Sequence, residues 1–387
     1  MQTRDFKTRS LFLPQQNPYR NPDAWEIGID VGYSGVKGLS RNMAYCFPTY
    51  IKKLSADCIS IGKPGPMDIV YRDGETGAMY AIGEKAEKMI SLDSGADNNT
   101  ALYGKNRYFS DVFKLSSRTG IGLGLLNNKF GDPSGKKIKI QSGLPPAYMK
   151  EDQERLKEAL MGRHVFDLKI GTGDWTHFDF TLDESNIKPP MQQPMGVLIS
   201  AITDKNGMPE MDARNIMSGN TMVVDPGFRT CDLCPMRNSD IDPYDCKTFE
   251  ELSMFEIMQR TCNEIRDRYG MVISVPAIQN YLEKGKIKVM NRKELRSEEV
   301  DFTDILSAKA EEVCEELIAK LLELTNYFQE TDSLIIGGGT GAAWESQIRD
   351  RFKNLNTLRI ISGGKNSSLP SIFSVARGYY MYAINRP

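Results

Sequence analysis

Short apolar runs separated by glycine-rich turns alternate with amphipathic stretches along the chain, and this pattern predicts a mixed α/β protein. Residues 25–31, WEIGIDV, are mostly apolar, so we expect a buried strand there, followed by a turn and a hairpin partner over 36–45. Further strands are expected at 137–143, as short strands within 165–190, within 222–236, and in the runs LIIG and LRIIS. Helices are expected over 109–127, 150–164, 249–269 and 303–328, at the start of PMGVLISAI, and in SLPSIFSVARGYYMYAI.

A strand that ends in Asp-x-Gly occurs twice, at Asp30 and again at Asp225, 195 residues later in a chain of 387. Each copy is followed by a turn and another β-rich segment. This internal symmetry predicts two similar α/β domains facing each other across a cleft. The turn-rich region 46–108 is expected to be a small inserted subdomain.

Composition and charge narrow the classes of function. A length of 387 residues suits two or three domains, and a formal net charge of −2 leaves no overall positive field to attract nucleic acid. The basic stretch KGKIKVMNRKELR at 284–296 is therefore interpreted as a solvated surface face. No apolar run approaches the ~20 residues that span a bilayer, and LFL is too short for a signal-peptide core, so we expect a cytoplasmic protein without membrane contact.

Seven scattered cysteines, an odd number, predict free thiols in a reducing compartment rather than a disulfide framework. Cys231 and Cys234 form one C-x-x-C, but no second pair follows and the chain has only two histidines. We therefore expect neither a metal centre nor a redox centre at this pair.

Two turns carry the residue types needed to bind a nucleotide triphosphate. Such binding requires small residues whose backbone N–H groups converge on phosphate, a cation, and carboxylates that hold Mg²⁺. The first turn supplies these as Asp30, Gly32, Ser34, Gly35 and Lys37, and the second supplies Asp225, Gly227, Thr230 and Asp232. Neither turn is a Walker A loop, and GGGTG at 337–341 lacks the following βαβ unit of a Rossmann fingerprint.

The order of three motifs carries a family resemblance. IGIDVGYSGVK, VVDPGFRTCD and LIIGGGTGAAW resemble the phosphate 1, phosphate 2 and adenosine motifs of the actin-like ATPase superfamily. SGLPPAY and SLPSIFSVARGYY resemble its two interdomain connections, and YAIGEKA is similar to a motif of the bacterial plasmid-segregation actins of the ParM type.

The resemblance implies the actin-like fold, an α/β architecture of two related ribonuclease-H-like domains around a nucleotide cleft with a small inserted subdomain. Domain I would comprise 25–142 plus 363–387, with the insertion at about 46–108, and domain II would comprise 143–362. Residues 1–24 would be an N-terminal extension that docks on a neighbouring subunit or is disordered.

The resemblance also implies the site residues. Asp30 and Asp225 would position Mg²⁺ through water and take part in catalysis. The nucleotide would be ATP/ADP or, as the alternative, GTP/GDP. Its phosphates would be bound by Gly32, Tyr33, Ser34, Gly35, Lys37, Gly227, Phe228 and Thr230. Its adenosine would lie against Gly338, Gly339 and Thr340.

The hydrolytic water needs a polar residue to orient it, and the resemblance assigns this role to Gln193, with Gln192 as its neighbour and alternative. A glutamine orients water but is a poor base, so slow turnover is expected. Phe228 and Arg229 depart from the small residues usual in the second turn, and their bulk could reshape that hairpin.

The implied function is a nucleotide-dependent ATPase that assembles head to tail into filaments and segregates or positions plasmid DNA. An adaptor DNA-binding protein at a centromere-like site would contact the DNA, so no direct nucleic-acid contact is expected. The alternatives are a non-polymerising ATPase of the superfamily, a small-molecule kinase, or a scaffold that binds nucleotide without turnover.

Overall fold

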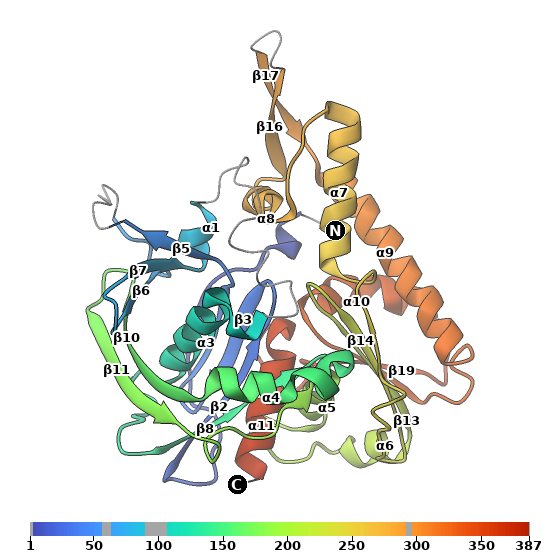
Figure 1. Ribbon diagram of the computed structural model, residues 1–387. Helices are drawn as coiled ribbons and strands as arrows, with labels where there is room; N and C mark the ends of the chain where they lie inside the picture. The colour runs from blue at the N-terminus through green and yellow to red at the C-terminus, as the bar shows by residue number, and fades with distance from the viewer. Residues whose placement is uncertain (1–2, 56–62, 90–106, 292–295, 387) are drawn as a thin grey trace. The chain divides into compact units, whose positions relative to one another are not determined.

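A computed structural model describes residues 3–55, 63–89, 107–291 and 296–386 (Figure 1). The chain divides into two compact units. Of the described residues, unit 1 comprises 3–7 and 214–362, and unit 2 comprises 8–89, 107–213 and 363–386. No helix among the described residues is long and apolar enough to cross a membrane.

Unit 2 is built on a five-stranded sheet of order β1-β4-β3-β2-β8. Its strands are β1 (Leu11–Pro14), β2 (Ala24–Val31), β3 (Gly35–Ser40), β4 (Met43–Pro48) and β8 (Lys137–Gln141). Helix α3 (Asp111–Gly124) packs on the face that carries Ile27 and Ile29, and α11 (Ser374–Asn385) packs against Gly28. Because side chains alternate along a strand, the two helices cover opposite faces of β2.

A second sheet of unit 2 has the order β11-β10-β6-β7-β5. It joins β5 (Ile51–Leu54), β6 (Ile69–Asp73) and β7 (Met79–Ile82) to the long hairpin β10 (Gly162–Ile170) and β11 (Trp175–Leu182). The region predicted as an insertion thus shares its sheet with strands from much later in the chain. Residues 56–62 and 90–106 of that region lie outside the described residues.

The rest of unit 2 consists of short elements and two helices. Strands β9 (Gly143–Leu144) and β12 (Met191–Gln192) pair in parallel, and α4 (Met149–Leu160) and α5 (Gln193–Ile202) follow them in turn. Three single turns complete it, α1 (Glu84–Glu87), η2 (Arg107–Phe109) and η3 (Pro146–Tyr148). The helix predicted in PMGVLISAI is confirmed as α5.

Unit 1 has one central sheet of order β15-β14-β13-β18-β19. Strand β13 (Asn220–Pro226) is antiparallel to β14 (Cys231–Arg237) and parallel to β18 (Ser333–Ile336); β15 (Lys247–Phe249) and β19 (Arg359–Ser362) are the edges. The helices are α6 (Ala213–Ser218), α7 (Met254–Tyr269), α8 (Val275–Ile278), α9 (Thr303–Leu324) and α10 (Gly339–Phe352), with the turns η1 (Thr3–Phe6), η4 (Gln279–Tyr281) and, in unit 2, η5 (Ser371–Phe373).

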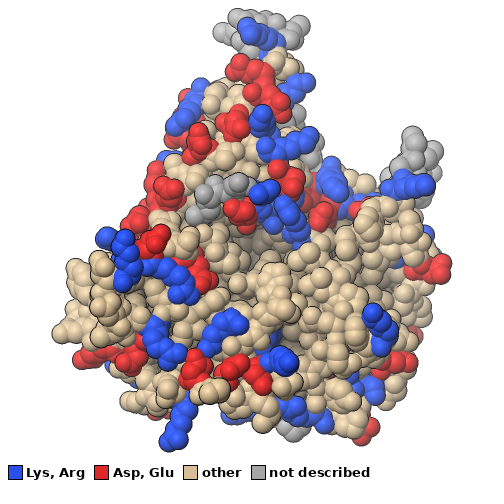
Figure 2. All heavy atoms as spheres, turned by 180° about the vertical axis from the view of Figure 1, so that it is seen from behind, with Lys and Arg blue, Asp and Glu red and all other residues tan. Residues whose placement is uncertain are grey.

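The basic stretch at 284–296 provides β16 (Lys286–Asn291) and the start of β17 (Arg296–Asp301), an antiparallel hairpin that projects from unit 1 (Figure 1). Its residues 292–295 lie outside the described residues. Acidic residues of β17 stand opposite the lysines of β16, and both signs of charge cover this end of the unit (Figure 2). The mixture of signs agrees with the interpretation of a solvated face.

Two expectations for the N-terminal part of the chain need correction. The hairpin partner expected over 36–45 is two strands, because Arg41 and Asn42 form a turn and Asn42 donates to the carbonyls of Leu126 and Gly131. Disorder of the N-terminal extension is wrong, because the extension is structured from residue 3 and Leu11–Pro14 pairs with β4, whereas its docking on a neighbouring subunit stays a prediction. Leu11 and Leu13 of this strand pack on the core cluster that contains Phe373. The polar residues on both sides of the short apolar run hid this strand from the sequence pattern.

The prediction of free cysteines is wrong for one pair. Cys234 and Cys246 form a disulfide that closes the segment between β14 and β15, whereas Cys46, Cys231, Cys262 and Cys314 are free and buried. Cys58 lies outside the described residues. The two cysteines of the C-x-x-C therefore do not act together: Cys234 is in the disulfide, whereas Cys231 is a free thiol. Burial raises the pKa of Cys231 well above the usual thiol range.

Candidate functional site

The first predicted turn connects β2 to β3 in unit 2. The Gly32 N–H donates to the Gly35 carbonyl at 3.1 Å, which closes a tight turn. Thr49, directly after β4, holds it from the other side: its N–H donates to the Ser34 carbonyl and its hydroxyl to the Gly32 carbonyl, both at 3.0 Å. The carbonyl oxygens of Gly32, Ser34 and Gly35 are therefore all occupied within the protein, which favours an anion over a cation as the ligand of this turn.

Three predicted site residues meet at the end of β2. The Lys37 ammonium lies 3.2 Å from one carboxylate oxygen of Asp30, and the Gln193 amide donates to the other oxygen at 3.2 Å. Asp30 is only 6% exposed. A carboxylate at this depth needs such partners, because burying an unpaired charge is costly. Lys37 also lies against Gly32, where a Cβ would be 2.8 Å from its nitrogen.

Close backbone packing keeps Asp30 and Gln193 within hydrogen-bond distance, although 163 residues separate them in the sequence. A Cβ on Gly28 of β2 would be 2.4 Å from the Tyr380 nitrogen of α11, and a Cβ on Gly378 of α11 would be 1.8 Å from the Gly196 carbonyl oxygen of α5. Glycines at these crossings let β2, α11 and α5 touch backbone to backbone. The positions of the two side chains thus depend on one rigid stack.

Arg377 fastens the far end of α5 to α11. Its guanidinium donates at 2.6 Å to the carbonyl of Ser200, which lies in the last turn of α5 where carbonyls lack helical partners, and at 2.8 Å to the carbonyl of Asp204 just beyond the helix. Burial lowers the pKa of Arg377 to about 10. It remains charged near neutral pH, so it completes the stack that carries Gln193.

The second predicted turn connects β13 to β14 in unit 1. The Gly227 N–H donates to the Thr230 carbonyl at 2.7 Å, and Asp225 lies directly opposite Asp232 in the ladder. Both carboxylates are buried, Asp232 completely. Opposite residues of an antiparallel ladder point to the same face, so the two carboxylates lie on one face of the hairpin. Asp232 therefore joins Asp225 as an oxygen donor suited to Mg²⁺ and its waters.

Phe228 and Arg229, the bulky residues of this turn, pack against α7. The Phe228 ring meets the Phe255 ring edge to face with centroids 6.1 Å apart, and Arg229 pairs with Glu250 at 2.8 Å. Arg229 also lies over the Phe255 ring. The hairpin therefore keeps its tight turn, and the Phe228 side chain packs within the protein.

The glycine-rich turn after β18 approaches this second hairpin. A Cβ on Gly338, whose φ is 72°, would lie 2.8 Å from a carboxylate oxygen of Asp225. Thr340 donates to the Gly227 carbonyl at 3.4 Å, and α10 starts at Gly339. The predicted phosphate 2 and adenosine residues of unit 1 therefore form one surface.

Two further residues support the first turn. Buried Arg107 donates to the Val31 carbonyl at 2.5 Å, and its guanidinium lies 4.1 Å from the centre of the Tyr33 ring. Together with Thr49 it fixes the backbone on which the predicted phosphate contacts depend. Neither residue could be found from sequence pattern, because both act from segments remote from the motif.

No group of three or more His, Cys, Asp or Glu side chains able to hold a metal ion occurs in the described ranges. An ion held mainly by water and by a few carboxylates is compatible with this arrangement, and Mg²⁺ commonly binds proteins in that way. In unit 1, Asp225 and Asp232 supply oxygen donors suited to such an ion, and in unit 2 Asp30 supplies one.

Comparison with known proteins places the fold. Residues 28–196 match the family described as the actin-like protein N-terminal domain. Among solved structures, a 15-stranded ParM filament from Clostridium botulinum is 20% identical with a TM-score of 0.72 over 94% of this chain and 99% of that chain. The pCBH ParM non-polymerisable quadruple mutant gives 20% identity and a TM-score of 0.70 over 93% and 98% of the two chains.

The archaeal actin homologue Ta0583 gives 18% identity and a TM-score of 0.63 over 94% of this chain and all of that chain. A comparison with curated protein sequences found no match. The structural likeness covers nearly the whole chain, whereas the sequence match is confined to its first half. The chain therefore has the actin-like fold, and its residues 28–196 match the family of actin-like protein N-terminal domains.

Proposed function

We propose that this chain is a filament-forming, nucleotide-dependent actin-like ATPase that segregates or positions plasmid DNA through an adaptor protein. The meeting of Lys37 and Gln193 on the Asp30 carboxylate carries the nucleotide part of this proposal. These are a phosphate-neutralising cation, a residue able to orient water, and an acidic group suited to hydrated Mg²⁺.

In the proposed role the backbone N–H groups of 33–35 and the Lys37 ammonium bind phosphate oxygens of ATP or GTP. Lys37 then exchanges Asp30 for phosphate, and Asp30 becomes free to accept hydrogen bonds from water. Mg²⁺ bound through water to Asp30 and Asp225 would neutralise charge on the phosphates. Gln193 orients the attacking water, and since an amide is a poor base, turnover is slow.

The assembly part of the proposal is supported by likeness to a ParM protein whose solved form is a filament. Repeated head-to-tail association of one chain generates an open helix when the contact does not close. Nucleotide would control assembly through contacts that differ between two conformations. The formal net charge of −2 favours DNA contact through an adaptor in the cytoplasm over direct binding.

Phosphate release and electron microscopy of the purified chain test the proposal. With Mg²⁺ and ATP we expect slow phosphate release and filaments at micromolar concentrations, and GTP in a parallel reaction determines the preferred nucleotide. Asp225→Ala should abolish hydrolysis. The control variant Asp240→Ala, at an exposed position just after β14, should hydrolyse nucleotide normally. Unchanged phosphate release by Asp225→Ala would refute the assignment of the second hairpin.

A further inference from the structure

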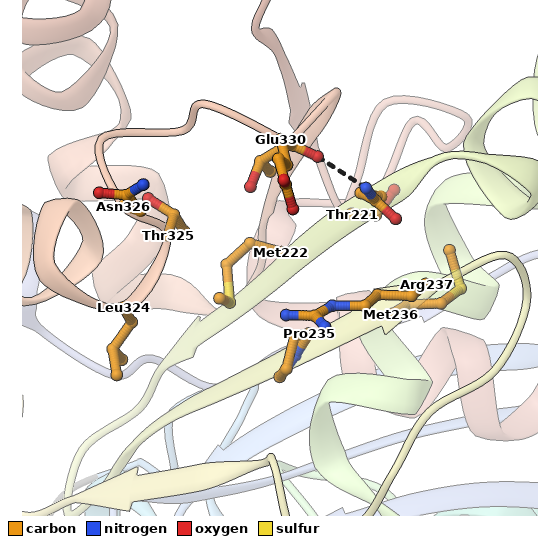
Figure 3. Close-up of a pocket in the computed structure, with 11 residues that line it drawn as sticks. Thr221, Met222, Pro235, Met236, Arg237, Leu324, Thr325, Asn326 and Glu330 are labelled. Atoms are coloured by element: carbon orange, nitrogen blue, oxygen red, sulfur yellow. Dashed lines mark hydrogen bonds between the residues drawn. The ribbon is translucent and has the colours of Figure 1, made fainter.

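A cavity of about 190 Å³ opens in unit 1 at the start of β13, at the opposite end of this strand from Asp225. Its walls are the first residues of β13, the last residues of β14, the end of α9 and the segment before β18 (Figure 3). None of the residues proposed above to bind nucleotide lines this cavity.

Two turns in the left-handed backbone region border the cavity. Asn238 and Ser239 follow β14, and Asn326, Tyr327 and Phe328 follow α9. These five are all the non-glycine residues with positive φ in the described part of the chain. Non-glycine residues adopt this conformation at a cost and retain it where the surroundings enforce it, often at binding sites.

The surroundings enforce both turns. Ser239 donates to the Met217 carbonyl at 2.9 Å, and the Phe328 N–H donates to the Thr325 hydroxyl at 3.0 Å. The buried Phe328 ring packs edge to face on Phe352. With Phe328 anchored, Tyr327 is turned outward and is 70% exposed.

The lining combines the apolar side chains of Met222, Pro235 and Leu324 with polar and charged residues. Met222 and Leu324 point into the space between the strands and the end of α9 (Figure 3). Arg237 lies on the strand side and Glu330 on the opposite side (Figure 3). Neither charged group has a hydrogen bond or ion pair within the ranges 3–55, 63–89, 107–291 and 296–386.

The size of the cavity selects the class of occupant. Small-molecule and cofactor sites typically measure about 300–1,000 Å³, whereas a cavity of roughly 150 Å³ holds benzene. A space of this size therefore suits one aliphatic or aromatic side chain. A flexible methionine in the lining adapts to different side chains. Tyr327 follows the lining residue Asn326, and exposed tyrosines are enriched at protein interfaces.

We propose that this cavity is a docking site for a peptide segment of another protein, which inserts one apolar side chain and places an acidic side chain against Arg237. The guanidinium at the rim is complementary to a carboxylate. Glu330 on the other side selects against a second acidic residue there. The proposal is independent of the nucleotide chemistry and can fail or succeed without it.

Methyl NMR of the full-length protein labelled at methionine provides the test. The probes are acetylated, amidated peptides Gly-Glu-Leu-Ser-Gly and Gly-Lys-Leu-Ser-Gly, with Gly-Glu-Ser-Ser-Gly lacking the apolar side chain. The Met222 methyl signal, assigned with an Ile substitution, should shift saturably with the acidic leucine peptide. Binding should be about threefold tighter than for the basic peptide, as expected for an exposed ion pair, and the serine peptide should give no shift.

Charge reversal separates specific docking from other causes. Arg237→Glu should remove or invert the preference for the acidic peptide, while Arg296→Glu on the remote β17 should leave it unchanged. Equal thermal unfolding midpoints of the two variants would show that both are folded. The proposal is overturned by the absence of saturable shifts, by shifts that Arg237→Glu does not alter, or by shifts that follow protein concentration without peptide, which would make a second copy the occupant.

Discussion

Gly378→Ala tests the backbone stack that carries the proposed site. The new Cβ would lie 1.8 Å from the Gly196 carbonyl oxygen, whereas real Cβ contacts are not shorter than 3.0 Å, so α5 and α11 must separate by about 1.2 Å. Helix propensity alone would stabilise the variant by about 1 kcal/mol. Overpacking typically costs about 1–3 kcal/mol, and here the obstacle is backbone that cannot rotate away. We therefore expect the free energy of unfolding to decrease. The sign of this change shows whether overpacking or helix propensity dominates.

The same displacement moves Gln193, at the start of α5, away from Asp30. A shift of about 1 Å in a positioning group can cost roughly a hundredfold in rate. Urea unfolding measures the first effect, and phosphate release at a temperature where the variant is fully folded measures the second. A variant that is more stable than the parent, with an unchanged rate, would refute the inference that this crossing fixes the site.

Three further predictions concern separate features. Gln193→Ala should slow phosphate release about tenfold to a hundredfold, because Gln193 reaches Asp30 while Gln192 pairs in a strand, so Gln192→Ala should have a small effect; the reverse order would exchange their roles. Tyr327→Gly should be more stable than Tyr327→Ala by about 1 kcal/mol in urea unfolding, since only glycine relieves a φ of 59°, and equal stability would argue against the left-handed turn. Burial lowers the pKa of His164 from 6.5 to about 4, so the unfolded state takes up a proton first as pH falls. Stability should therefore decrease between about pH 6.5 and 4 by about 3 kcal/mol from this group, and His164→Phe should flatten that part of the profile.

Local patterns were sufficient to predict the elements that carry the motifs. The apolar run before Asp30 and the glycines after it predicted the strand and turn that the structure contains, and the Pro-x-Gly after Gln193 predicted the start of α5. These features depend on near neighbours in the chain. The strand at Leu11–Pro14 was missed because its pairing with β4 is a long-range contact that its short apolar run does not reveal.

Residues that support the site escaped prediction for the same reason. Thr49 and Arg107 carry no motif, and their roles arise only when the fold brings them beside the first turn. The packing of Phe228 onto Phe255 likewise depends on where α7 starts. The pairing of Cys234 with Cys246 could not follow from a count of cysteines, since connectivity is set by the β14–β15 geometry.

Sedimentation of the purified chain in different nucleotide states tests the central claim most directly. With Mg²⁺ and ATP, most of the protein should pellet as filaments above a micromolar critical concentration, and it should remain in the supernatant with ADP or with EDTA. Lys37→Ala should lose the response to ATP, because its cation no longer neutralises phosphate. A chain that stays monomeric with ATP across micromolar concentrations, or pellets equally in every nucleotide state, would contradict the account.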